Sequence, residues 1–359
     1  MGMFKDILGS DETLFKNPVA LDYDFIPKLI PYREKEQRQF AAAIKPLFAE
    51  RNGRNVLVVG KPGVGKTVAL KHVLQELEEE TDDIIPIYIN CWQKNTAHKI
   101  ILELCDVVGY KFTQNRRTDE LFDMVKASLN KKACVLILDE IDKLEDYDFL
   151  YDFLESIYRK SVFVITNFKE WITQLDERIK SRLTPVTVEF LPYSLNETKG
   201  ILDERAKLAF YPAVLEEDAL NAIIEKTYNI QDIRSGIFLL KESGNFAEEE
   251  ASKKIKLAHA RKAIQKLEEF SIKKKENLDD DNQMILSIVR QNDCLKSTEV
   301  FTKYQQIGGK AAYRTFQRKL DKLADGKFIT LTKKVGGTEG TTTIVSIGRP
   351  EKETSLNDF

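Results

Sequence analysis

A glycine-rich segment in the first quarter of the chain has the residue types of a phosphate-binding loop. It reads Gly60-Lys61-Pro62-Gly63-Val64-Gly65-Lys66-Thr67. Glycines carry no Cβ, so backbone N–H groups can converge on phosphate oxygens, and a helix that begins there adds its N-terminal partial charge. Lys66 is placed to reach the β- and γ-phosphates, and the Thr67 hydroxyl to bind Mg²⁺. The segment predicts a site for ATP or ADP with Mg²⁺.

Two acids that follow an apolar run form a second candidate element. Residues 135–138 are Val-Leu-Ile-Leu, and Asp139 and Glu140 come next. Asp139 can hold the Mg²⁺ shell, and Glu140 can orient or deprotonate an attacking water. Asn167 ends a further apolar run, where an amide can hold that water or the γ-phosphate, although a turn residue at a strand end would look the same. These residues predict hydrolysis of ATP to ADP and phosphate.

The elements that would position these side chains alternate along the chain. Short apolar runs predict strands at 55–59, 84–90, 134–138, 161–166 and 186–190. Helical spacing of apolar residues predicts helices between them, at 34–49, from the glycine loop to 79, and at 94–108, 119–130 and 149–159. Strands that alternate with helices imply an α/β domain with a parallel sheet covered on both faces.

The strand pattern stops after residue 193. Helical patterns follow at 196–209, 217–227, 233–246 and 248–270, then a charged segment at 271–281 without apolar periodicity, and then three helices and a glycine-tipped hairpin around 336–340. We therefore expect five parts: a nucleotide-binding α/β domain at 1–193 with an N-terminal arm at 1–33, an all-helical domain at 194–270, a linker at 271–281, a winged helix-turn-helix at 282–349, and a tail at 350–359.

Positive charge is concentrated near the C-terminus. The whole chain has a formal net charge of −2, whereas residues 296–349 contain eleven Lys or Arg and four Asp or Glu. In the third helix of this part, about 311–324, apolar spacing turns Phe316 inward and leaves Arg314 and Arg318 on the opposite face, which can enter a major groove. Winged helices also bind proteins, but the charge favours duplex DNA. The candidate DNA contacts are Arg314, Gln317, Arg318, Lys319, Lys322, Lys333 and Lys334.

The bulk composition excludes several classes of protein. With 359 residues, 42% hydrophobic and 31% charged, the chain is expected to be soluble and to form two or three domains. No apolar run approaches the roughly 18 residues of a membrane helix, and the N-terminus lacks a signal peptide, so we expect a cytoplasmic protein associated with the nucleoid. The four cysteines lack metal-ligand spacing, which predicts reduced thiols.

Several segments together resemble the archaeal origin-recognition and cell-division-cycle initiators of the AAA+ superfamily. The resemblance runs from about residue 15 to 349 and rests most on Asp-Glu-Ile-Asp-Lys-Leu at 139–144 and Phe-Leu-Pro-Tyr-Ser at 190–194. Further matching segments lie at 27–33, 55–67, 90–91, 166–167, 175–183, 201–206 and 232–234. The resemblance implies an AAA+ domain, a helical lid and a C-terminal winged helix.

The resemblance also implies roles for individual residues. Asn167 matches the first sensor, and Arg234, on the lid, the second. Arg178 and Arg182 fall on the segment that carries the arginine finger, and Arg182 is favoured because it follows a serine, as in related clamp loaders. Tyr193 and Arg205 lie in matching segments and are expected to bind nucleotide. The family suggests a second DNA contact at 92–110, with Lys94, Thr96 and Lys99. Gln231 stands where the family usually has glycine, so the turn before Arg234 is expected to differ.

The expected function is that of an ATP-dependent replication initiator. Such a protein binds duplex origin DNA, recruits or loads the replicative helicase, assembles with other initiator subunits, and hydrolyses ATP slowly as a switch. Two alternatives remain open from the sequence. One is a clamp-loader-like or DNA-translocating AAA+ motor, and the other is a nucleotide-locked transcription or plasmid-maintenance regulator.

Overall fold

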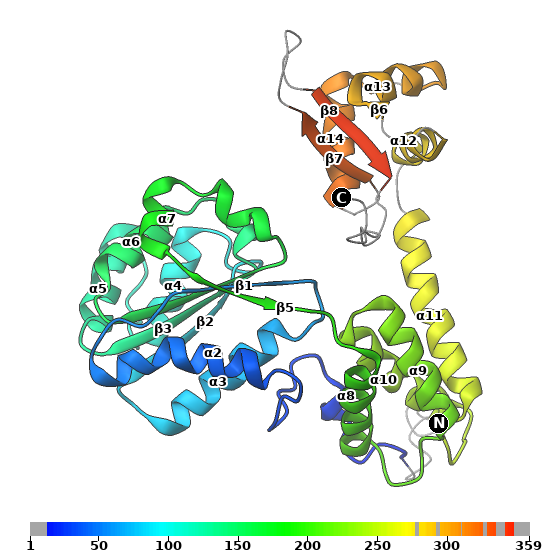
Figure 1. Cartoon of the computed structure of the whole chain (residues 1–359), viewed down its shortest axis with the longest axis horizontal. Coiled ribbons are helices and arrows are strands. Elements are labelled where there is room, and N and C mark those ends of the chain that lie inside the picture. The colour runs from blue at the N-terminus through cyan, green and yellow to red at the C-terminus, as the bar shows by residue number, and fades with distance from the viewer. Residues whose placement is uncertain are drawn as a thin grey trace, which may run out of the picture. The chain divides into compact units, whose positions relative to one another are not determined.

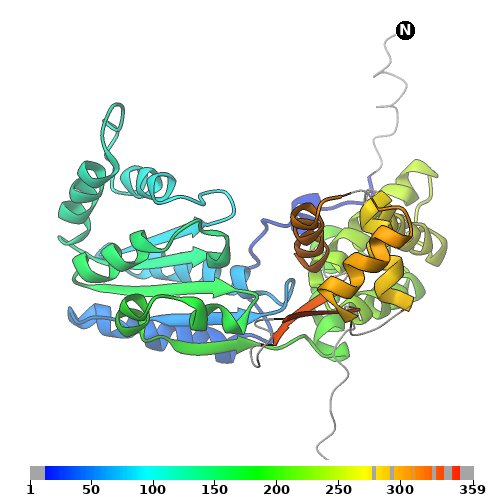
Figure 2. The same ribbon diagram turned by 90° about the horizontal axis from the view of Figure 1, so that it is seen from above.

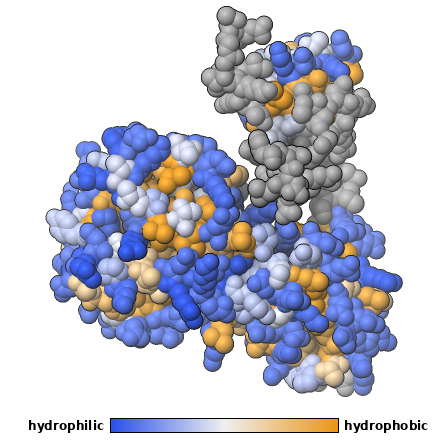
Figure 3. Space-filling model, viewed as in Figure 1, coloured by the Kyte–Doolittle hydropathy of each residue, from blue (hydrophilic) through white to orange (hydrophobic). Residues whose placement is uncertain are grey.

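The computed structural model describes residues 13–276, 280–291, 295–309, 311–325, 329–334 and 342–347. The chain divides into two units, residues 1–265 and 266–359. Among the described residues, no helix combines the length and the apolar character needed to cross a bilayer. The face shown in Figure 3 is mostly hydrophilic, with apolar side chains in small groups.

A five-stranded parallel sheet forms the centre of the first unit. Its strands are β1 (Val56–Gly60), β2 (Ile84–Asn90), β3 (Ala133–Asp139), β4 (Lys160–Thr166) and β5 (Val186–Phe190), in the spatial order β2-β3-β4-β1-β5. Every residue of β3 is buried. A strand buried on both faces gains from apolar residues at each position, which explains its uninterrupted apolar sequence.

Helices cover both faces of this sheet (Figures 1 and 2). Val56 and Val58 of β1 pack in one core cluster with α2 (Glu34–Ile44) and α3 (Lys66–Glu80), while Leu57 and Val59 pack in another. Successive side chains of a strand point to opposite faces, so one strand feeds both cores. The second core contains α4 (Ala97–Val107), α5 (Thr118–Leu129), α6 (Asp148–Ser156) and α7 (Glu177–Leu183). The predicted parallel α/β domain is confirmed.

A helical lid completes the first unit. It contains α8 (Leu195–Ala209), α9 (Glu217–Ile230), α10 (Ile233–Glu249) and the start of α11 (Leu257–Glu276). Ser194 and Glu197 form a capping box that fixes the start of α8, and Asp232 caps α10. The short helix η1 (Pro18–Leu21), from the N-terminal arm, packs against α8 and α10.

The second unit has three helices and a small antiparallel sheet. Its elements are α12 (Asp280–Gln291), β6 (Leu295–Lys296), α13 (Ser297–Gln306), α14 (Tyr313–Asp325), β7 (Ile329–Lys334) and β8 (Thr342–Ile347), with strand order β6-β8-β7. This order of helices and strands is consistent with the expected winged helix-turn-helix. Phe316, Leu320 and Leu323 are buried in its core, as their spacing predicts. The predicted hairpin tip at 336–340 lies outside the described residues.

Most of the segment at 271–281, which is expected to be a linker, is helical, and its role as a linker stays a prediction. Helix α11 continues to Glu276, and α12 begins at Asp280. Lysine and glutamate are good helix formers, so a helix can continue through charged residues that have no apolar periodicity. The other expected domain boundaries remain predictions.

Candidate functional site

The glycine loop connects β1 to α3 and lies against the lid. Gly63 has φ +77° and Gly65 has φ +90°, a backbone region that side chains disfavour. A Cβ on Gly63 would lie 1.9 Å from an Asp232 carboxylate oxygen, and one on Gly65 would lie 2.6 Å from the Tyr193 hydroxyl. The Ile233 N–H also donates to the Gly63 carbonyl at 3.2 Å. Glycine is therefore favoured at both positions by its backbone conformation, and a Cβ would also have to displace the end of the Asp232 or Tyr193 side chain.

Lys66 points its ammonium group across the loop. Its Nζ donates to the carbonyls of Gly60 at 2.6 Å and Lys61 at 2.8 Å, and to Asn167 Oδ1 at 2.8 Å. The residue is 7% exposed, and burial lowers the pKa of its ammonium group to about 8. The predicted pair of Lys66 and Asn167 thus meets in one place, although the residues are far apart in sequence.

Asp139 gathers three donors at the carboxyl end of β3. Thr67 Oγ1 and the Tyr88 hydroxyl donate to its Oδ2 at 2.7 and 2.8 Å, and the Glu140 N–H donates to Oδ1 at 2.9 Å. Burial and then Asp139 raise the pKa of Tyr88, so this side chain stays a donor. Tyr88 was not a sequence candidate. Its role depends on β2 lying beside β3, where Asn90 pairs with Asp139.

This oxygen-rich corner fits Mg²⁺. No group of three or more His, Cys, Asp or Glu that could hold a metal occurs among the described residues. Mg²⁺ prefers oxygen ligands, keeps several waters, and is usually held by one or two protein groups plus phosphate oxygens. The Thr67 hydroxyl and the Asp139 carboxylate supply that number of protein groups.

Glu140 adopts a left-handed backbone conformation, with φ 54° and ψ 47°. Non-glycine residues in this region carry a strain of about 1–3 kcal/mol, and such strain is concentrated at functional sites. Burial, and then the negative charges of Asp139 and Asp142, raise the pKa of the Glu140 carboxyl. A raised pKa makes a carboxylate a better proton acceptor.

Arg234 reaches the same cavity from the lid. Its Nη2 donates to Asp232 Oδ2 at 2.7 Å, and this hydrogen bond raises the pKa of the guanidinium. Gln231, in the position expected to alter this turn, adopts φ 60°, the conformation that a glycine would take easily. Its Oε1 also accepts from Lys61 Nζ at 3.1 Å. The turn is thus made without glycine, and Arg234 still lines the cavity.

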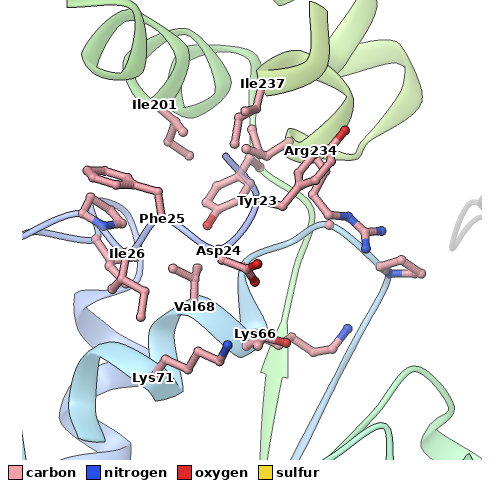
Figure 4. A pocket seen from close by; sticks show the side chains of 18 of the residues that line it. Tyr23, Asp24, Phe25, Ile26, Lys66, Val68, Lys71, Ile201, Arg234 and Ile237 are labelled. Atoms are coloured by element: carbon pink, nitrogen blue, oxygen red, sulfur yellow. The ribbon is translucent and has the colours of Figure 1, made fainter. Parts of the chain in front are cut away.

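One cavity joins the arm, α3, the lid and the loop (Figure 4). Phe25, Val68 and Ile201 lie on one side of it, whereas Lys66 and Arg234 lie on the other. Asp139, Glu140, Thr67 and Asn167 also line it. An apolar half joined to a half with converging charged groups is the arrangement that ligand sites use. Its chemistry suits a molecule with a flat apolar part and a chain of phosphates.

The remaining nucleotide candidates, Tyr193 and Arg205, both line the cavity, but their side chains have different partners. Tyr193 lines the cavity, and its ring centre lies 3.9 Å from the guanidinium of Arg33. Arg205 lines it too, but its guanidinium donates to the carbonyls of Ala20 and Phe25 in the arm.

The two candidates for the arginine finger, Arg178 and Arg182, do not line this cavity. Each is more than half exposed and pairs with an acid, Asp176 and Glu155 respectively.

Arg33 lies beside the site, and spacing alone did not single it out. It is 5% exposed, and its guanidinium donates to the carbonyl of Val64 in the loop and to that of Leu191, just before the lid. A buried arginine with two carbonyl partners fixes the backbone of both segments. Its only sequence signal was its place in the matching segment at 27–33.

The candidate DNA contacts on α14 are partly accessible. Arg314, Gln317 and Arg318 are exposed. Lys319 is turned toward Asp281, 3.2 Å away, and its side chain is 14% exposed. The side chains of Lys322, Lys333 and Lys334 lie outside what the structure describes.

In the segment at 92–110, the second suggested DNA contact, both candidate lysines already have polar partners. Lys94 pairs with Glu103 at 2.7 Å. Lys99 Nζ donates to Asn95 Oδ1, and Thr96 caps α4. The segment starts a well-capped helix, so its role in DNA binding stays a prediction.

Comparisons with known proteins agree with this architecture. Residues 49–169 match the family model of an AAA domain, and residues 199–265 match that of a Cdc6 AAA+ ATPase-type lid domain. ORC1-type DNA replication protein 1 of Archaeoglobus fulgidus is 30% identical over 335 residues, which cover 86% of this chain and 80% of the relative.

Two solved structures share the fold. The Aeropyrum pernix ORC1 protein in complex with DNA is 23% identical, with a TM-score of 0.72 over 94% of this chain and 95% of that one. The Aeropyrum pernix ORC2 protein in its ADPNP-ADP complexes is 18% identical, with a TM-score of 0.67 over 93% and 94%. With the phosphate loop, the acid pair and the lid arginine in one cavity, the chain belongs to the ORC1-type DNA replication proteins of the AAA+ superfamily.

Proposed function

We propose that this chain is an ATP-dependent replication initiator that binds duplex DNA at an origin and recruits or loads the replicative helicase. The observation that carries the proposal is the cavity in which Lys66, Asp139, Glu140 and Arg234 meet under the lid. An ATPase site closed by a lid can act as a switch, because the two nucleotide states hold different contacts. The protein would act in the cytoplasm, at the nucleoid, together with other initiator subunits.

The cavity supports a definite placement of ATP. The base would lie between the arm, Val68 and Ile201, which line one side of the cavity, and the phosphates would lie on the loop near Lys66. Bound Mg²⁺, held by Thr67 and Asp139, would neutralise phosphate charge. The neighbour solved with ADPNP and ADP supports both nucleotides as ligands.

The remaining groups divide the chemistry between them. Glu140 accepts the proton of the attacking water, Asn167 orients that water or the γ-phosphate, and Arg234 contacts the γ-phosphate and ties it to the lid. Arg178 and Arg182 do not line this cavity, so a finger from α7 would act on the site of another subunit. We favour Arg182. Turnover that waits for such a partner is slow in the isolated chain.

The location of the protein on the chromosome tests the function as a whole. We expect a genome-wide binding map to show a few strong sites at replication origins, and the replicative helicase to co-purify with the protein. Binding spread over promoters without a helicase contact would favour the transcriptional or plasmid-maintenance regulator. A closed ring with strong DNA-stimulated turnover would favour the AAA+ motor.

We also propose that α14 provides the main DNA contact. Replacement of Arg318 by alanine should weaken duplex binding and, if Arg318 contacts a phosphate, should reduce the magnitude of the slope of log K against log salt by about 0.9. Replacement of Arg314 or Gln317 should instead cost about 1–3 kcal/mol for the correct sequence, since these residues are our candidates for base contacts. Anisotropy titrations of labelled duplex at several salt concentrations measure both effects.

Lys319 provides the matched control for this experiment. It lies next to Arg318 on the same helix, but its ammonium is held near Asp281. We therefore expect Lys319→Ala to change DNA affinity and the salt slope less than Arg318→Ala does. Equal affinity and slope for wild type and all three α14 variants (Arg314, Gln317 and Arg318) would place the DNA elsewhere on the chain.

A further inference from the structure

We propose that His72 and Arg205 are positioning residues that hold the arm across the base side of the cavity, and that they set how fast nucleotide leaves. The segment concerned, residues 22–31, is called the crossing segment below. The inference rests on the proposed function, because it concerns the nucleotide of that same cavity.

The arm is fastened to the lid up to the crossing segment. The Lys16 N–H donates to the Ala209 carbonyl at 2.8 Å, and the Leu14 N–H donates to Glu248 Oε1 at 2.7 Å. Ala20, in η1, is fully buried. These contacts are with α8 and α10, so residues before the crossing segment belong to the lid.

Arg205 makes the last fastening on the lid side. Its Nη1 donates to the Ala20 carbonyl at 3.0 Å and its Nη2 to the Phe25 carbonyl at 3.3 Å. The guanidinium carbon also lies 4.8 Å from the ring centre of Phe25. An arginine fork that bonds two carbonyls fixes their separation. Arg205 therefore sets the shape of the arm where it enters the cavity wall.

His72 makes the fastening on the other side. It lies on α3, the helix that starts at the phosphate loop, and its Nε2 lies 2.9 Å from the Lys28 carbonyl. A carbonyl accepts only, so Nε2 carries the hydrogen. Nδ1 has no hydrogen-bond partner among the described residues, and it lies 3.9 Å from Glu76. The ring is 7% exposed, so its one hydrogen bond goes to the arm.

Between these two fastenings the arm forms a wall of the cavity. Tyr23, Phe25 and Ile26 line it there, Ile30 lines it just beyond Lys28, and Val68 of α3 lines it as well. Arg205 of the lid holds one end of this wall, and His72 of the α/β domain holds the other end. A base bound there would contact the crossing segment, so we expect movement of this segment to accompany its release. Loops that cover a ligand often limit its release.

The two fastenings differ in strength. Arg205 contributes two hydrogen bonds and a ring contact, whereas His72 contributes one hydrogen bond. The Lys28 end should therefore detach first, and the bond to His72 should limit opening. The net worth of one neutral hydrogen bond corresponds to an increase in release rate of about two- to thirteenfold when it is lost.

The test is the dissociation rate of a fluorescent ADP analogue from the full-length protein, followed by stopped flow after a chase with unlabelled ADP. His72→Leu removes the donor and should raise this rate about two- to thirteenfold. His72→Gln keeps an N–H donor near the same place and should stay within about twofold of wild type. A role in packing alone would not be restored by glutamine. If the leucine variant does not fold, Arg205→Lys tests the other fastening: lysine can reach one carbonyl, so release should be faster than in wild type.

His259 provides the matched control. It is a buried histidine whose Nε2 bonds Glu250 in the lid, and it does not line the cavity. His259→Leu should lower the melting temperature and leave ADP release unchanged. Unchanged release in His72→Leu, or equally faster release in His259→Leu, overturns the inference while the nucleotide site stands. No nucleotide binding by the wild-type protein overturns the proposed function as well.

Discussion

Replacement of Lys66 by alanine should raise the dissociation constants for ATP and ADP about a hundredfold or more. The Lys66 ammonium is held by two loop carbonyls and Asn167, at the centre of the glycine loop. A hydrogen bond to a charged group is worth about 1.5–3 kcal/mol, and a truncated partner leaves the phosphate charge unpaired in a buried place. Every 1.4 kcal/mol is about tenfold in affinity. Titration of a fluorescent nucleotide measures the change.

Lys61 is the matched control, because it is a lysine of the same loop whose ammonium group contacts Gln231 and not Asn167. Its Nζ lies 3.1 Å from Gln231 Oε1 and is exposed. Lys61→Ala should therefore leave nucleotide affinity within a few-fold of wild type. Equal losses in the two variants would mean that the loop responds to any lost charge, and an unchanged affinity in Lys66→Ala would remove the loop from the site.

The pH dependence of binding provides a second readout for Lys66. Burial lowers its pKa to about 8, so the free protein loses this charge as the pH rises through that value. A bound phosphate favours the charged form, so above pH 8 binding must take up a proton, and affinity falls by up to about tenfold per pH unit. Lys61→Ala should keep this decline. A constant affinity up to pH 9.5 would contradict it.

The nucleotide motifs and the parallel sheet could be predicted because their signals are local. A phosphate loop needs its glycines, lysine and threonine at fixed spacing, and a doubly covered strand such as β3 needs an unbroken apolar run. The bounds of β2 and β5 agree with the prediction residue for residue. Asp139 is the last residue of β3 and Glu140 follows it directly, so locating the strand also located the acids.

The rest of the site depends on contacts between distant segments. Tyr88 reaches Asp139 only because β2 lies beside β3 at one register. Arg33 and His72 gain their partners only when the loop, the arm and α3 come together. No spacing rule within one segment reveals such pairs. For the same reason the sequence could not show that Lys319 is turned toward Asp281.

Replacement of Glu140 by glutamine should leave ATP binding near wild type and reduce hydrolysis about 10²–10⁴-fold, the usual contribution of a general base. Glutamine keeps the length and shape of the side chain but cannot accept the proton of the attacking water. Glu140 also lies in the cavity beside Asp139, whose contacts to Thr67 and Tyr88 do not involve the Glu140 side chain. Single-turnover hydrolysis with saturating protein separates this loss from any change in binding.

Glu145→Gln is the matched control, five residues further along the chain. The Glu145 side chain accepts from Asn95 and does not line the cavity, so its loss should leave turnover unchanged.

The fall of the hydrolysis rate at acid pH provides a second test of Glu140. Burial and the neighbouring acids raise the pKa of Glu140, so protonation removes the base at a higher pH than for an ordinary glutamate. Hydrolysis by the wild type and by Glu145→Gln should fall together as the pH is lowered. The residual activity of Glu140→Gln should lack that fall, since no carboxylate remains there to protonate; a fall that persists in this variant would assign the proton transfer to another group.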